Sequence, residues 1–135
     1  MGGGGLQRRV VGRRPRGKGV RVRQPAPLAV RRGDIWWVDL DPTRGGEIHK
    51  RRPAVVMTAD GLNRARRTVV VVPLSTGPEP RPPIVVATPS AGVRAVAVCD
   101  QLRAIDKGRL NGFSGRLSTA DLGMVEDGIR RILEL

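Results

Sequence analysis

Two uninterrupted runs of apolar, mostly β-branched residues limit what this chain can fold into. They occupy residues 53–58 (PAVVMT) and 68–74 (TVVVVPL), and a polar, arginine-rich stretch separates them. β-Branched residues pack well on a pleated surface, and continuous apolar residues are typical of strands that are covered on both faces. The two runs therefore predict two buried strands.

Shorter segments predict the other elements. Residues 35–40 are expected to form a strand with Trp36 and Val38 on one face and Trp37 on the other. Residues 84–87 and 95–99 predict two further strands. Several short strands followed by one helix indicate a mainly β fold with α (α+β), in which a C-terminal helix packs on a small, strongly curved sheet or barrel.

The C-terminal helix has its own signals. Ser118 and Asp121 have the spacing of a capping pair, and Leu122, Val125 and Ile129 then recur at helical intervals, followed by Ile132 or Leu133. Gly123 and Gly128 each weaken a helix by roughly 1 kcal/mol relative to alanine. We therefore expect packing to stabilise this helix.

The charge is uneven along the 135 residues. The net charge is +13, and residues 1–30 hold eight basic residues and no acid, which leaves 25 − 8 = 17 basic against 12 acidic residues in 31–135. The first segment is rich in Gly, Arg and Pro and lacks apolar periodicity, so we predict a disordered basic tail at 1–30 and one folded domain at 31–135. The tail is either an arm that holds RNA electrostatically or an inert extension from a misplaced start codon.

Composition also excludes several classes of protein. Cys99 is the only cysteine and His49 the only histidine, which excludes a disulfide framework and predicts no metal site and no cofactor. No apolar run approaches the roughly 18 residues of a membrane span. We expect a soluble, cytoplasmic protein with no membrane partner.

The segment 31–53 (RRGDIWWVDLDPTRGGEIHKRRP), together with VVVVPLS, CDQLRAIDKGRL and LSTADLGMVEDGIRRIL, closely resembles the MazF/PemK toxin family over about residues 32–135. The resemblance implies a CcdB/PemK-like fold with an SH3-like β-barrel, and a homodimer. It further implies a type II toxin that cleaves single-stranded mRNA at a short sequence without metal, through the 2′-hydroxyl, leaving 2′,3′-cyclic phosphate and 5′-hydroxyl ends. A cognate antitoxin protein is the implied partner.

The resemblance also assigns site residues. The family's catalytic arginine precedes the proline of an RP motif and falls on Arg52, its catalytic Thr or Ser falls on Ser75, and its loop acid falls on Glu47. Arginine suits the phosphate because it is permanently charged and binds in a bidentate manner, but it is a poor base. Ser75 and Glu47 are therefore the candidates for proton transfer. His49 has a suitable reference pKa, of about 6.5, yet the family places no catalytic histidine there.

Other residues are candidates for RNA binding. Lys50 and Arg51 leave open which basic side chain beside Arg52 meets the phosphate, and Trp37 can stack on a base or on another side chain. The remaining RNA-binding candidates are Arg44, Arg64, Arg81 and Gln101. The alternative function is a non-catalytic toxin of the same fold that binds nucleic acid or gyrase, and a third is a nucleic-acid condenser dominated by the tail.

Overall fold

The computed structural model describes residues 29–40 and 51–135. The predicted tail, apart from Ala29 and Val30, lies outside the described residues, as do Arg44, Glu47, His49 and Lys50. Val30 is buried in the core, with 6% of its surface exposed. The packed domain therefore includes Val30.

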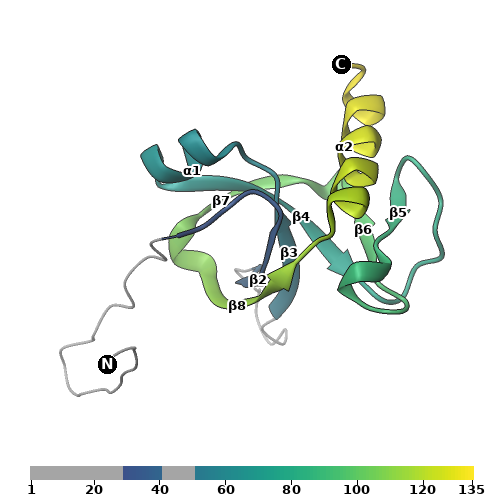
Figure 1. The fold of residues 1–135 in the computed structure, drawn as a ribbon, viewed down its shortest axis with the longest axis horizontal. Coiled ribbons are helices and arrows are strands. Elements are labelled where there is room, and N and C mark those ends of the chain that lie inside the picture. The colour runs from purple at the N-terminus through teal and green to yellow at the C-terminus, as the bar shows by residue number, and fades with distance from the viewer. Residues whose placement is uncertain (1–28, 41–50) are drawn as a thin grey trace, which may run out of the picture.

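Antiparallel strands dominate the described structure (Figure 1). The strands are β2 (Asp34–Asp39), β3 (Arg51–Val56), β4 (Thr68–Ser75), β5 (Val85–Ala87), β6 (Val96–Val98), β7 (Arg103–Asp106) and β8 (Leu110–Arg116). The helices are α1 (Asp60–Ala65) and α2 (Thr119–Leu133), and three 3₁₀ turns are η1 (Pro89–Ala91), η2 (Cys99–Gln101) and η3 (Lys107–Arg109).

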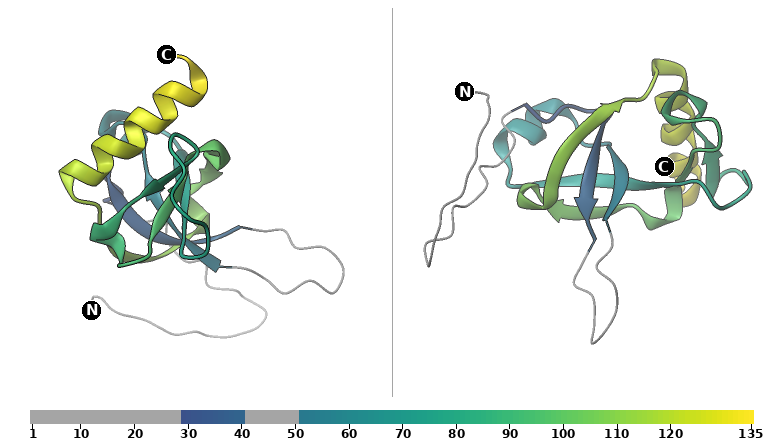
Figure 2. Two further views of the ribbon diagram at one scale, coloured as in Figure 1. Left: turned by 90° about the vertical axis from the view of Figure 1, so that its right-hand side faces the viewer. Right: turned by 90° about the horizontal axis from the view of Figure 1, so that it is seen from below.

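One sheet contains all these strands, in the order β5-β6-β4-β3-β2-β8, with β7 also paired to β4. The predicted mainly β class with a packed C-terminal helix is confirmed. The described strands do not close into a complete barrel, because no ladder joins β8 to β7 or β5. Helix α2 packs at the β5 and β6 end of the sheet, while α1 lies at the other end (Figures 1 and 2).

The central strands β3 and β4 are buried on both faces at residues 54–56 and 71–74, as the continuous apolar runs predict. Adjacent residues of β3 alternate between two clusters: Val55 packs with α2, and Ala54 and Val56 pack on the opposite face. The helix-side cluster comprises Ile35, Val55, Val72, Leu74, Val86, Ala97, Cys99, Leu117 and Val125. The inner cluster comprises Val30, Val38, Ala54, Val56, Val69, Val71, Ile105 and Leu110.

Helix α2 begins as its sequence predicts. The hydroxyl of Ser118 accepts a hydrogen bond from the backbone nitrogen of Asp121 at 3.1 Å, which satisfies one of the free donors of the first turn. Val125 is fully buried, and Ile129 packs on the helix-side cluster. Among the described residues, no helix is long and apolar enough to cross a membrane.

Candidate active site

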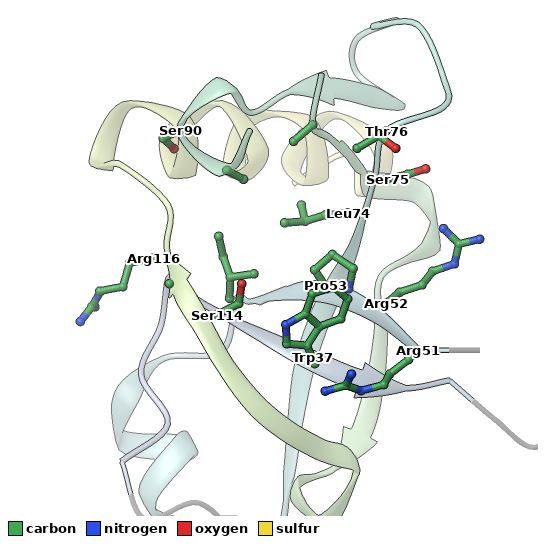
Figure 3. Close-up of a pocket in the computed structure, with 14 residues that line it drawn as sticks. Trp37, Arg51, Arg52, Pro53, Leu74, Ser75, Thr76, Ser90, Ser114 and Arg116 are labelled. Atoms are coloured by element: carbon green, nitrogen blue, oxygen red, sulfur yellow. The ribbon is translucent and has the colours of Figure 1, made fainter. Parts of the chain in front are cut away.

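An open groove of about 780 Å³ is lined by residues of β2, β3, β8 and the end of β4, and by η1 and Ala95 (Figure 3). Its described lining contains three arginines, four hydroxyl side chains and no carboxylate. The polar lining residues are Arg51, Arg52, Ser75, Thr76, Ser90, Ser114 and Arg116, and the apolar part includes Ile35, Trp37, Pro53 and Leu74. Such a surface suits a polyanion that also carries flat apolar groups.

Arg52 and Ser75 come together because β3 and β4 are neighbours. The antiparallel register of the two strands pairs Ala54 with Pro73. Arg52 precedes Ala54 and Ser75 follows Pro73, so both residues lie toward the same end of the strand pair. Both side chains are partly exposed at one end of the groove (Figure 3). The Arg52 side chain forms no hydrogen bond or ion pair with the other described residues, so its guanidinium is available to a ligand.

Arg51, by contrast, is held by the protein. Its Nε and Nη2 atoms donate to Oδ1 of Asn111 at 3.1 and 2.9 Å, and Nη2 also donates to the Asn111 carbonyl oxygen at 3.2 Å. Its Cζ lies 5.0 Å from the centroid of the Trp37 ring, within range of a cation–π interaction. Arg51 thus joins β3 to β8 at the edge of the groove.

Trp37 lies on the groove side of β2, as the alternation in 35–40 predicts. A Cβ atom on Gly112 would stand 3.5 Å from both Cδ1 of Trp37 and Nη2 of Arg51, and Gly112 has a φ of +145°. The positive φ favours a glycine there, whereas 3.5 Å is an ordinary van der Waals contact and shows that β8 packs directly against Trp37 and Arg51. The indole is therefore supported by Arg51 and β8 and forms part of the groove wall.

Hydrogen bonds to the start of α2 hold the η1 side of the groove in place. Oδ2 of the buried Asp121 accepts hydrogen bonds from the backbone nitrogen of Ser90 at 2.7 Å and from its hydroxyl at 2.5 Å. The backbone nitrogen of Ser118 in turn donates to Oγ of Ser90 at 3.0 Å. These bonds fix η1, and with it Ser90 and Ala91, against the start of the helix.

The structure separates the remaining candidates from the groove. Arg64 is exposed in the last turn of α1, Arg81 is exposed beside its bridge to Val85, and Gln101 is exposed in η2. None of the three lines the groove. Their roles in RNA binding stay predictions, and so do those of Arg44, Glu47 and Lys50, which lie outside the described residues.

Sequence reasoning missed one arginine and three hydroxyl side chains of the groove: Arg116, Thr76, Ser90 and Ser114. Thr76 directly follows Ser75 in the sequence, and this position could have indicated that Thr76 also lines the groove. Arg116 and Ser114 lie on β8, a strand that no apolar sequence pattern predicts. Among the described residues, no three His, Cys, Asp or Glu side chains are grouped so as to hold a metal ion.

Cys99 is a buried apolar group, as expected. It is fully buried in the helix-side cluster, and burial, with a smaller contribution from the charge of Asp100, raises the pKa of its thiol to about 11. A thiol that stays protonated is a weak nucleophile.

Comparison with solved structures defines the class of fold. The chain matches the crystal structure of a MazE–MazF complex from Deinococcus radiodurans with a TM-score of 0.69 and 23% identity, over 83% of this chain and 99% of that one. The fold is therefore that of MazF proteins.

Sequence comparison then gives the family. Residues 31–133 match the family described as PemK-like, MazF-like toxin of type II toxin-antitoxin system. Endoribonuclease MazF9 of Mycobacterium tuberculosis is 36% identical over 115 residues, which are 78% of this chain and 98% of that protein. Endoribonuclease PemK of Escherichia coli is 38% identical over 105 residues, 65% of this chain and 79% of that protein. The chain belongs to this PemK-like, MazF-like toxin family, as its sequence motifs predict.

Proposed function

We propose that the protein is the toxin of a type II toxin–antitoxin pair and an endoribonuclease that cleaves single-stranded RNA at a short sequence. The RNA's own 2′-hydroxyl attacks the adjacent phosphorus, which yields a 2′,3′-cyclic phosphate and a 5′-hydroxyl without a bound metal. One observation carries the proposal: Arg52 and Ser75 lie at one end of a groove whose described lining has cations and hydroxyls but no carboxylate. The named relatives are endoribonucleases.

The chemistry divides among three residues. As the 2′-oxygen bonds to phosphorus, negative charge grows on the phosphorane, and Arg52 stabilises it through charge-assisted hydrogen bonds. Glu47 takes the proton of the 2′-hydroxyl, and Ser75 gives its hydroxyl proton to the departing 5′-oxygen and regains one from solvent. The bond between phosphorus and the 5′-oxygen then breaks. Because the attacking oxygen belongs to the RNA itself, no water is consumed in this step.

The basic groove also suggests how the toxin is restrained. One solved structure of the same fold is a MazE–MazF complex, and an antitoxin with an acidic segment would complement the arginines of this groove and exclude RNA. Because mRNA is the substrate, the toxin acts in the cytoplasm. We expect it to work as a homodimer.

The decisive experiment compares two neighbouring arginines that carry equal charge. Purified protein is incubated with a mixed-sequence RNA in EDTA and the new ends are mapped. Arg52→Ala should lower kcat by about 10²- to 10³-fold, as loss of an oxyanion donor does. Arg51→Ala should lower kcat less than about tenfold, because Arg51 bonds Asn111 and stacks on Trp37.

Substrate variants test the nucleophile independently. A single 2′-deoxy substitution at the cleaved nucleotide should abolish cleavage, since it removes the attacking group.

Protein variants test the proton-transfer residues. Ser75→Thr should keep activity and Ser75→Ala should lose most of it, while Glu47→Gln should lower kcat. Unchanged cleavage by Arg52→Ala, or no cleavage by the wild type, would favour the non-catalytic toxin instead.

A further inference from the structure

Arg116 is the groove arginine that neither takes part in the proposed chemistry nor is held by Asn111 and Trp37, as Arg51 is. It is the last residue of β8 and lies across the groove from Arg51 and Arg52 (Figure 3). Its side chain is 49% exposed. The groove therefore carries positive charge at both ends.

A buried carboxylate orients this arginine. Asp34 is only 2% exposed, and its Oδ2 accepts a hydrogen bond from the backbone nitrogen of Arg31 at 2.9 Å. Its Oδ1 has no hydrogen-bond partner among the described residues and lies 3.6 Å from Nε of Arg116. That distance gives electrostatic attraction but no short hydrogen bond. Asp34 thus attracts the inner edge of the guanidinium toward the protein.

The outer part of the guanidinium is left for a ligand. Nη2 lies 3.4 Å from the carbonyl oxygen of Arg32, and Nη1 has no partner among the described residues. A Cβ atom added at Gly115 would meet nothing within 4 Å, so the approach along β8 is open. Ser114 adds a hydroxyl to the same strand of the groove lining.

We propose that Arg116 binds a second phosphodiester of the RNA substrate, on a nucleotide flanking the one that is cleaved. This inference rests on the proposed function. RNA carries a phosphate at every nucleotide, and a strand whose cleaved phosphate sits at Arg52 brings another phosphate past the opposite end of the groove. Contacts of this kind fix the register of the strand without reading its sequence. Arg116 is then a binding residue that acts on KM and leaves the chemical step alone.

The first test separates binding from chemistry. Arg116→Ala should raise KM for a short RNA about tenfold, the value of one charge-assisted hydrogen bond, with kcat within about twofold of wild type. Arg116→Lys should recover part of the loss because it keeps the charge. Arg66→Ala is the matched control, since Arg66 is exposed at the end of α1 and does not line the groove. Thermal unfolding of each variant shows whether Asp34 without its cation has destabilised the fold.

The second test identifies the phosphate. RNA oligonucleotides that carry one uncharged methylphosphonate linkage at each flanking position in turn are compared with wild type and Arg116→Ala. The methylphosphonate at one flanking position should weaken binding to the wild type and should not weaken binding to Arg116→Ala any further. If Arg116→Ala behaves like Arg66→Ala, or lowers kcat with KM unchanged, or if every linkage affects both proteins equally, the second subsite does not exist. A wild type that fails to cleave any RNA overturns the proposed function, whereas cleavage without these effects overturns the Arg116 subsite alone.

Discussion

At the scale of single residues, burial of Cys99 makes a prediction about pH. The folded-state pKa of the thiol is raised to about 11 from an ordinary value of 9.0. Below pH 9 the thiol is protonated in both states, so its contribution to stability is fully present there. Between about 9 and 11 only the unfolded chain releases the proton, and stability is lost as pH rises.

Urea unfolding at pH 8 and pH 10 checks this. The free energy of unfolding of the wild type should fall more between the two pH values than that of Cys99→Ala, which has no thiol to ionise. At pH 8 the native thiol should also react with iodoacetamide far more slowly than the thiol in urea. Equal rates in the two states would mean that Cys99 is accessible.

Arg51 and Arg52 show what the sequence could and could not reveal about the site. The motif places Arg52 before a proline at the start of β3, and Ser75 ends the neighbouring β4, so that both residues line the groove. The role of Arg51 depends on Asn111, which lies 60 residues away along the chain. No local pattern encodes a contact of that range, so the run 50–52 leaves open which side chain is available to a phosphate.

At the scale of elements, the two glycines of α2 differ in the space around them. A Cβ atom at Gly128 would stand 2.9 Å from the carbonyl oxygen of Pro83 and 3.1 Å from Sγ of Cys99, whereas at Gly123 it would meet nothing within 4 Å. Gly128 thus lets α2 approach the β5 side of the sheet. The cost that Gly128 imposes on the helix is offset by the close packing it permits.

Alanine at each position tests this distinction. Gly123→Ala should raise the free energy of unfolding by about 0.5–1 kcal/mol through helix propensity. Gly128→Ala should lower it by about 1–3 kcal/mol, because the backbone oxygen of Pro83 must shift. Denaturant unfolding measures both, each variant serving as the control for the other. Stabilisation by both substitutions would show that α2 has room at Gly128.

The strands that sequence reasoning missed are those without an apolar pattern. β8 (LNGFSGR) contains two glycines and buries only Leu110, yet it pairs with β2 and supplies one wall of the groove. Its shape depends on Gly112 and Gly115, which have φ values of +145° and +154°. β7 and α1 were missed for the same reason, since Ile105 and Asn63 are their only buried residues. Tertiary pairing, rather than local preference, forms these elements.

At the scale of the whole molecule, the fold class follows from the sequence because its central strands are buried on both faces. The expected strands at 35–40, 53–58, 68–74, 84–87 and 95–99 all correspond to strands of the structure. The order of strands in the sheet and the place of the groove do not follow from those runs. The strand order and the place of the groove depend on which strands β7 and β8 pair with. Neither β7 nor β8 has a strong apolar pattern in its own sequence.

The packed domain also makes a prediction about the basic segment 1–28. Among the described residues, both core clusters are built from Val30 onward, and the family match starts at residue 31. A chain of residues 29–135 should therefore fold, with a melting temperature close to that of the full chain, and should cleave the same RNA with the same kcat. Loss of folding or of kcat would show that residues 1–28 belong to the catalytic domain.

The same truncation decides between the two roles open to this segment. It removes eight of the 25 basic residues and no acid, which lowers the net charge from +13 to 13 − 8 = +5. If the arm holds RNA, log KM should depend less steeply on log salt after truncation, by about 0.7 in slope for each phosphate that the arm neutralises in the full chain. An inert extension leaves the slope unchanged. Because kcat reports the groove and the salt slope reports the arm, one pair of proteins measured over a salt series separates the contributions.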